Sequence, residues 1–221
     1  MSEGGRGVGG VVEWSRLRLV CTKVEHSPTH LYPPPLHLSC RGWMFGDRDE
    51  YPSKVLDNLY CGTYKHARNA HVRLACGITH VVDVESGGSR PDNLDPALYC
   101  ASPMCDFGST DVGVDSSMLA RTLEFIARAL DAGGVVLVQC EWGVNRSATM
   151  TCAFLVVHRD MSLLDAAITV KTARPVTRPR DEYIHQLLAV EAAARRGMEL
   201  SSGEAVAAVF DDGYVGERRL P

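Results

Sequence analysis

The fold of this chain is decided by one stretch, Val135-Val-Leu-Val-Gln-Cys140-Glu-Trp-Gly-Val-Asn-Arg146-Ser147, which predicts a strand, a short turn and the start of a helix. Four apolar residues in a row open it, a pattern typical of a parallel strand that is covered on both faces. The apolar run at 148–157 indicates a helix. We therefore expect Cys140 to lie where the strand ends and Arg146 to lie near the start of the helix.

The predicted turn has the chemistry of an anion site. A turn that closes on a helix N-terminus directs several backbone N–H groups into one concavity, where the helix dipole adds roughly half a positive charge. A dianionic phosphoryl group binds in such a concavity. The same field lowers the pKa of a cysteine thiol, so that the thiolate forms near neutral pH and becomes a nucleophile. The sequence thus predicts that Cys140 attacks phosphorus.

Three other residues complete this interpretation. The guanidinium of Arg146 is a planar fork that matches two phosphoryl oxygens, and Gly143 permits the backbone conformation that a cradle requires. Ser147 places a hydroxyl near the sulfur, where it can stabilise the thiolate as a leaving group. The residues expected to bind the phosphate are Glu141, Trp142, Gly143, Val144, Asn145 and Arg146. A buried structural cysteine is the alternative, but the strand, glycine, serine and helix together favour the phosphate site.

The segment 139–149 resembles the signature loop of cysteine-dependent protein tyrosine phosphatases, and specifically their small, atypical dual-specificity branch. Other segments are similar to motifs of that family in the same order: Pro52–Gly62 to its opening hairpin, Gly77–Val84 to its next strand and Ala173–Pro179 to the segment before its last helix. The resemblance implies an enzyme that dephosphorylates phosphotyrosine and phosphoserine or phosphothreonine in proteins. It implies a phosphocysteine intermediate and neither a metal nor a cofactor.

Cleavage of a phosphoester also requires a proton donor for the leaving oxygen, so a carboxyl group is expected on a loop beside Cys140. The candidates before the catalytic strand are Asp106, Asp111 and Asp115. The family acid follows a Tyr-x-x-apolar-Pro-apolar-x-Asp pattern, which Tyr99-Cys-Ala-Ser-Pro103-Met-Cys-Asp106 matches except at Ser102. The resemblance therefore assigns this role to Asp106. Because the separation from Cys140 is long (140 − 106 = 34), Asp111 stays the alternative acid, and Asp115 is expected to begin the next helix.

The residue before the nucleophile departs from the family pattern. A histidine is common there, and this chain has Gln139, which cannot supply a positive charge. We interpret the change as tuning of activity. Two alternative functions remain open. One is a pseudophosphatase that binds phosphorylated partners without turnover. The other is an enzyme like the RNA 5′-triphosphatases, because Gly143-Val-Asn-Arg146 also resembles the loop of those enzymes. Glu141 argues against a highly charged inositol head group, so a phosphorylated protein is the expected partner.

Composition limits the remaining classes of function. The chain has 221 residues, 45% of them hydrophobic, and a formal net charge of −4, with no basic cluster that would indicate a nucleic-acid partner. It has no apolar run of the roughly 20 residues that span a bilayer, and no membrane partner is expected. Its eight cysteines contain no Cys-x-x-Cys pair. This favours a reducing compartment, the cytoplasm or alternatively the nucleus. The oligomeric state stays open.

The pattern predicts three parts: an N-terminal extension at 1–45, partly flexible; a catalytic domain at 46–197; and a C-terminal tail at 198–221 without a clear core pattern. Helices are expected at 116–132, from Leu163 to about 173 after a Ser162 cap, and at 181–196. Strands that alternate with helices predict an α/β fold, with a central, mostly parallel, twisted sheet flanked by helices on both faces, as the resemblance to protein tyrosine phosphatases also implies.

Three arginines lie between the helices predicted at 163–173 and 181–196. Arg174, Arg178 and Arg180 lie in a loop that the family brings near the cleft. One interpretation is that one of them contacts a second phosphate or an acidic part of the substrate. The other is an ordinary solvated basic loop.

Overall fold

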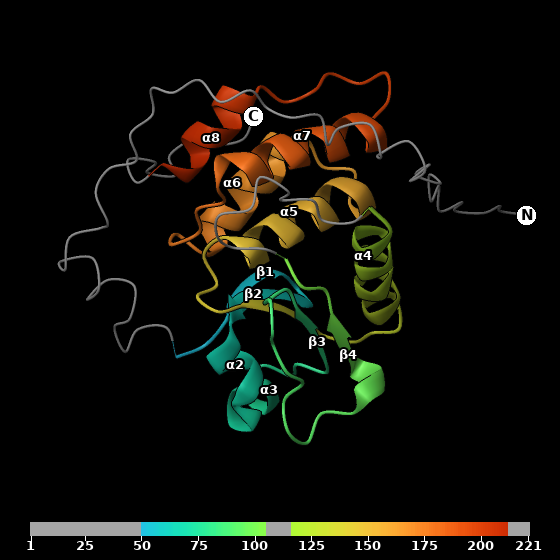
Figure 1. The fold of residues 1–221 in the computed structure, drawn as a ribbon, viewed down its shortest axis with the longest axis vertical. Coiled ribbons are helices and arrows are strands. Elements are labelled where there is room, and N and C mark those ends of the chain that lie inside the picture. The colour runs from blue at the N-terminus through green and yellow to red at the C-terminus, as the bar shows by residue number, and fades with distance from the viewer. Residues whose placement is uncertain (1–49, 105–115, 212–221) are drawn as a thin grey trace, which may run out of the picture.

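The computed structural model describes residues 50–104 and 116–211 (Figure 1). The predicted N-terminal extension, both candidate acids Asp106 and Asp111, and Asp115 lie outside these residues. The strands are β1 (Ser53–Leu56), β2 (Leu59–Thr63), β3 (His80–Asp83), β4 (Tyr99–Ala101) and β5 (Val136–Cys140). The helices are α2 (Tyr64–Arg68), α3 (Ala70–Ala75), α4 (Ser116–Asp131), α5 (Arg146–His158), α6 (Leu163–Ala173), α7 (Asp181–Ala194) and α8 (Gly203–Phe210), with a short 3₁₀ helix at Pro96–Leu98.

The strands form one sheet in the order β1-β2-β5-β3-β4. β1 and β2 form the expected antiparallel hairpin, and β2, β5, β3 and β4 run parallel to one another. The prediction of a mostly parallel sheet is confirmed. β5 lies between β2 and β3, so its backbone is hydrogen-bonded on both sides and all five of its residues are buried. This burial explains why the strand is apolar up to Gln139.

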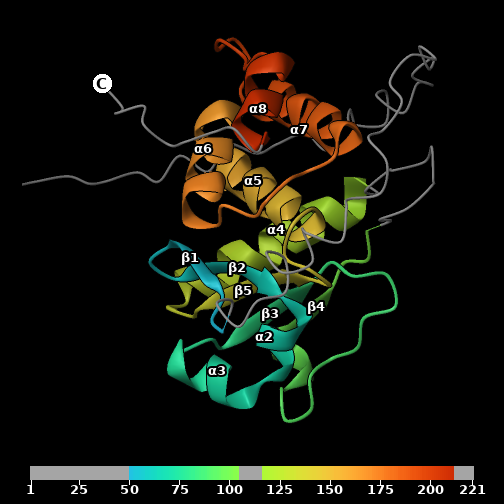
Figure 2. The same ribbon diagram turned by 90° about the vertical axis from the view of Figure 1, so that its left-hand side faces the viewer.

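Helices cover both faces of the sheet, as predicted. α2 and α3 lie on one side, and α4 and α5 lie on the other, with α6, α7 and α8 outside α5 (Figures 1 and 2). The alternation of side chains along β5 explains the two layers. Val136 and Val138 belong to the large core beneath α4 and α5, whereas Leu137 belongs to a smaller core with Ala67 of α2.

The four predicted helices are present as α4, α5, α6 and α7, with small differences at their ends. α4 is followed by Gly133, whose φ of +78° is the left-handed conformation that commonly ends a helix. The Ser162 hydroxyl accepts a hydrogen bond from the Asp165 N–H (3.0 Å) at the start of α6. α7 ends at Ala194, two residues before the predicted end. None of the described helices is long and apolar enough to cross a membrane.

The segment after 197 differs from the expectation. Residues 203–210 form α8, and its buried residues Val206, Val209 and Phe210 join the large core. The expected absence of a core pattern is therefore wrong for this segment, while the division of the chain into domains stays a prediction. The three residues occur at i, i+3 and i+4, the spacing of one helical face.

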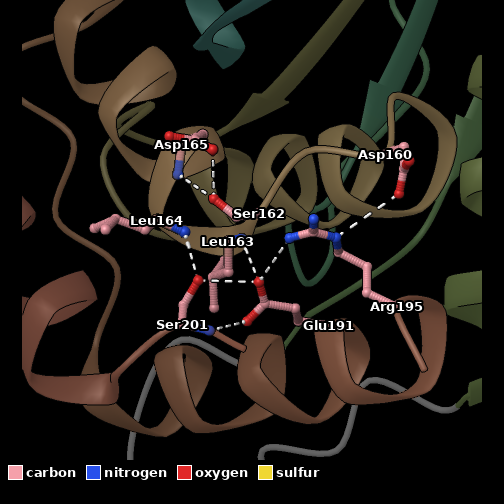
Figure 3. A network of polar contacts seen from close by, with 8 residues as sticks. All are labelled: Asp160, Ser162, Leu163, Leu164, Asp165, Glu191, Arg195 and Ser201. Carbon is pink, nitrogen blue, oxygen red and sulfur yellow. Dashed lines mark hydrogen bonds and ion pairs between the residues drawn. The ribbon is translucent and has the colours of Figure 1, made fainter. Parts of the chain in front are cut away.

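A fully buried carboxylate attaches this segment to the domain (Figure 3). Glu191 of α7 accepts hydrogen bonds from the Leu163 N–H (2.7 Å) and from the N–H and hydroxyl of Ser201 (both 2.9 Å). Arg195 completes the shell, with its Nη1 3.5 Å from Glu191 and its Nε 3.7 Å from Asp160. A buried charge with several donors is well compensated, so this network joins α6, α7 and the start of the α8 segment.

Candidate active site

Cys140 is the last residue of β5 and lies at the carboxyl edge of the parallel strands, where it pairs with Thr63 of β2. Ligands bind at this edge in open α/β sheets. The helix α5 begins six residues later at Arg146. The predicted strand, turn and helix are therefore present. The thiol is only 2% exposed, so a reacting group has to enter the turn to reach it.

Ser147 lies against the sulfur. Its Oγ is 3.3 Å from the Cys140 Sγ and accepts a hydrogen bond from the Cys61 thiol at 3.5 Å. Because Cys61 occupies an acceptor position on the hydroxyl, the Ser147 proton is available to Cys140. Burial raises the pKa of Cys61, although the positive charge of Arg174 opposes this effect. Cys61 therefore stays protonated and can continue to donate. Sequence reasoning placed Ser147 but missed Cys61, which lies on a neighbouring strand.

Arg146 begins α5 and is 3% exposed. Its Nη2 lies 3.9 Å from the Glu141 carboxylate across the turn. The Asn145 side chain makes no capping hydrogen bond at the start of α5, although asparagine is a good capping residue type. The Asn145 Oδ1 instead accepts a hydrogen bond from the Arg180 N–H at 3.1 Å. The start of the helix and the guanidinium thus both offer positive electrostatic potential at the turn.

Two further carboxyl groups act on Arg146, and sequence reasoning missed both. Burial raises the pKa of Asp83, against hydrogen bonds from the Glu85 N–H and the Tyr99 hydroxyl and the charge of Arg146. Burial also raises the pKa of Glu85, with the charges of Asp83 and Glu141 adding to the effect. Asp83 ends β3 beside β5. The sequence signal that could have identified Asp83 is an acidic residue at the end of an apolar, buried strand.

The described residues around Gln139 do not fully satisfy its side chain. Its side-chain carbonyl oxygen is buried and has no hydrogen-bond partner among the described residues. A buried acceptor without a donor destabilises the fold by about 1–3 kcal/mol. The residue before the nucleophile thus supplies no positive charge, and its side-chain oxygen has no partner among the described residues.

Gly143 and Arg174 lie in contact behind the turn. Gly143 has φ of +63°, and a Cβ there would lie 2.7 Å from the Gly62 carbonyl oxygen and 2.8 Å from the Arg174 Nη2. Glycine is therefore required both for the conformation and for the close approach. Arg174 is 2% exposed and donates to the Gly143 carbonyl at 2.7 Å. The interpretation of a solvated basic loop is wrong for Arg174.

The other two arginines of this segment contact the turn through their backbones. The Arg178 N–H donates to the Val144 carbonyl at 2.8 Å, and the Arg180 N–H donates to the Asn145 side chain. The Arg180 guanidinium lies 3.6 Å from Glu182. The described residues hold no group of three or more His, Cys, Asp or Glu side chains that is suited to a metal ion. The roles assigned to Asp106 and Asp111 stay predictions.

Comparisons with known proteins agree with this geometry. Residues 59–193, more than half of the chain, match the family model of the dual specificity phosphatase catalytic domain. Dual specificity protein phosphatase 1 of Arabidopsis thaliana is 33% identical over 143 residues, which are 65% of this chain and 70% of that protein. Dual specificity protein phosphatase 16 of Homo sapiens is 31% identical over 140 residues, which are 63% of this chain and only 21% of that protein.

Solved structures give the same result. The crystal structure of human DUSP28 superposes with a TM-score of 0.58 at 30% identity, covering 64% of this chain and 93% of that one. Human tyrosine phosphatase-like serine/threonine/tyrosine-interacting protein superposes with a TM-score of 0.57 at 28% identity, covering 64% and 96%. A strand that ends in Cys140, a short turn and an arginine at the start of α5 agree with this likeness. The chain belongs to the dual specificity phosphatase family.

Proposed function

We propose that the chain is a cysteine-dependent phosphatase that removes phosphate from tyrosine and from serine or threonine in phosphorylated proteins. The observation that carries the proposal is the position of Cys140 at the end of β5, with its Sγ 3.3 Å from the Ser147 hydroxyl. Arg146 begins the adjoining helix and provides a bidentate partner for phosphoryl oxygens. A nucleophile, a cation and a helix N-terminus at one turn support phosphoryl transfer.

The proposed reaction has two steps. The Cys140 thiolate attacks phosphorus and forms the S–P bond while the P–O bond to the substrate breaks, and Asp106 gives its proton to the leaving oxygen. Water then attacks the phosphocysteine, the Asp106 carboxylate takes a proton from this water, and the S–P bond breaks to release inorganic phosphate. Arg146 follows the charge on the oxygens in both steps. The Ser147 hydroxyl donates to the thiolate as it leaves, and Cys61 orients that hydroxyl.

Hydrolysis of p-nitrophenyl phosphate by the full chain tests this mechanism. Wild-type protein should release nitrophenolate and form a phosphorylated Cys140 that mass spectrometry detects after an acid quench. Cys140→Ser should abolish turnover, and Asp106→Ala should reduce kcat by about 100-fold to 10,000-fold, the usual contribution of a general acid. If Asp106→Ala kept full turnover while Asp111→Ala lost it, Asp111 would be the acid. Peptides with phosphotyrosine, phosphoserine or phosphothreonine would then define the substrate class.

A second function, capture of phosphorylated partners without turnover, is favoured by two observations. Gln139 has a buried oxygen without a partner among the described residues, and Glu141 places a carboxylate 3.9 Å from the arginine that would hold the phosphate. One solved relative is described as a phosphatase-like interacting protein. Wild-type protein that binds a phosphopeptide but leaves it and p-nitrophenyl phosphate intact, at every pH between 5 and 8, would establish capture and exclude the hydrolase.

A further inference from the structure

Three backbone carbonyls of the turn are contacted from one segment, the residues that follow α6. The Arg174 Nε donates to the Gly143 carbonyl at 2.7 Å, and its Nη2 lies 3.4 Å from the Trp142 carbonyl. The Arg178 N–H donates to the Val144 carbonyl at 2.8 Å. Three successive carbonyls thus point towards the residues that join α6 to α7. The guanidinium also reaches β1, where its Nη1 lies 3.4 Å from the Ser53 hydroxyl.

Peptide geometry gives these bonds a consequence. In a trans peptide the C=O and the following N–H point in opposite directions, and the described residues contain no cis peptide. Holding the Trp142 and Gly143 carbonyls on the Arg174 side therefore directs the Gly143 and Val144 N–H groups to the opposite side. Successive N–H groups that face one concavity form an anion nest. The side chain of Arg174 thus fixes the orientation of donors that it does not contact.

We propose that Arg174 is a positioning residue for the phosphate-binding turn, which holds the Trp142 and Gly143 carbonyls so that the N–H groups of Gly143 and Val144 face the phosphoryl oxygens. The proposal rests on the proposed function, because it assigns those N–H groups to a bound oxyanion. It differs from contact with a second phosphate or an acidic substrate group, since the Arg174 guanidinium is directed to the Gly143 and Trp142 carbonyls and to the Ser53 hydroxyl.

The close packing explains why arginine serves here better than other residues. A Cβ at Gly143 would lie 2.8 Å from the Arg174 Nη2, so the guanidinium lies directly against the turn. The planar fork of arginine reaches several acceptors at once from three nitrogens, whereas lysine donates from a single nitrogen. The charge is also felt at Cys61, whose thiol donates to Ser147, and it opposes the effect of burial there. Arg174 therefore adds positive potential behind a turn in which Gln139 supplies none.

A merely structural role has to be distinguished, because the Arg174 backbone also ends α6. Arg73 provides a matched control. It is a buried arginine as well, and its guanidinium donates to the carbonyls of Ala67 and Asp92 in the α2 and α3 layer. Arg73→Met and Arg174→Met both remove a buried guanidinium that satisfies backbone carbonyls, so both should lower thermal stability. Only Arg174 contacts the turn.

The experiment compares four proteins: the wild type, Arg174→Met, Arg174→Lys and Arg73→Met. For each, calorimetry gives the affinity for tungstate, and an assay gives kcat and KM for p-nitrophenyl phosphate. Circular dichroism gives the folded fraction at the assay temperature. Arg174→Met should lose about 100-fold in kcat/KM, the typical effect of a misplaced binding group, with a parallel loss of tungstate affinity. Arg174→Lys should recover part of both losses. Arg73→Met should keep both within about twofold, as expected for a distant site.

The outcomes separate this proposal from the proposed function. If the folded Arg174→Met protein keeps wild-type tungstate affinity and kcat/KM, Arg174 is not a positioning residue, although the hydrolase stands. If the wild type binds tungstate without hydrolysing the ester and Arg174→Met loses that binding, the positioning role stands and the hydrolase fails. Equal losses in Arg174→Met and Arg73→Met would overturn the positioning role, and so would a wild type that does not bind tungstate.

Discussion

Gln139 destabilises the fold through a buried oxygen that the described residues leave unpaired, and it places no positive charge beside Cys140. The Gln139 oxygen is buried without a partner among the described residues, next to the nucleophile in the sequence. Gln139→His should place a group that can be protonated there, and an opposite charge near a thiolate favours ionisation. We expect kcat/KM for p-nitrophenyl phosphate near pH 6 to rise by about tenfold, because the added positive charge favours the attacking thiolate. The acidic limb of the pH profile should move to lower pH.

Gln139→Met is the control for this prediction. Methionine removes the orphan oxygen without adding a charge, so it should raise the free energy of unfolding while leaving the pH profile unchanged. An equal gain in kcat/KM from the two variants would show that relief of the buried oxygen, and not the charge, limits the turn.

Ser147 is placed to act on one step more than on the other. Its hydroxyl lies 3.3 Å from the Cys140 Sγ and can donate to the thiolate as it leaves phosphorus. A hydrogen bond to a charged group contributes about 1.5–3 kcal/mol, so Ser147→Ala should slow breakdown of the phosphocysteine by about 10-fold to 100-fold. Rapid quench should then show phosphoenzyme accumulating after a burst. Thr169→Ala removes a comparable helical hydroxyl in α6 and should give no accumulation.

At the scale of elements, α8 contributes more to the fold than its composition indicated. Phe210 is buried in the core, and removing such a ring costs about 3–5 kcal/mol. Phe210→Ala should lower the free energy of unfolding by about this amount in urea titrations. Leu200→Ala changes an exposed apolar residue of the same segment and should stay within about 0.5 kcal/mol of the wild type. Similar losses in the two variants would mean that α8 is not part of the cooperative core.

The elements also show what the sequence could and could not reveal. β5, its turn and α5 were predictable because their signal is local: four apolar residues, a glycine and an apolar helix adjoin one another. The destination of the Arg174 side chain was not, because it depends on a carbonyl 31 positions away. α8 was missed although Val206, Val209 and Phe210 share a face, since eight residues give too short a periodicity beside so many Gly, Ser and charged residues.

For the whole molecule, the carboxyl group at the end of β3 makes stability depend on pH. Burial raises the pKa of Asp83 above its unfolded value, with Tyr99, Arg146 and Arg68 nearby. An acid with a raised folded pKa stabilises the fold below its unfolded pKa, and this stability is lost as pH rises through the folded value. Asp83→Asn keeps the shape without the charge. It should therefore raise the melting temperature at pH 7 relative to the wild type.

The sign of the effect is tested by repeating the melts at lower pH. The advantage of Asp83→Asn should shrink as the pH falls and disappear below the unfolded pKa of an aspartate, about 3.9, where both forms are neutral. Asp57→Asn changes an exposed carboxyl group and should follow the wild type at each pH. A constant advantage of Asp83→Asn at all pH values would contradict a role of the charge.

The position of β5 in the sheet bears on how the protein is made. The strand that carries Cys140 lies between β2 and β3, which precede it by many residues, so neither of its ladders is local in sequence. During synthesis β2 and β3 leave the ribosome before β5, so they cannot pair in the native order until β5 is available to lie between them. The residues that hold the turn from behind, Arg174 and Arg178, emerge later still. A nascent chain can therefore complete the turn around Cys140 only after α6 and the residues that follow it have emerged.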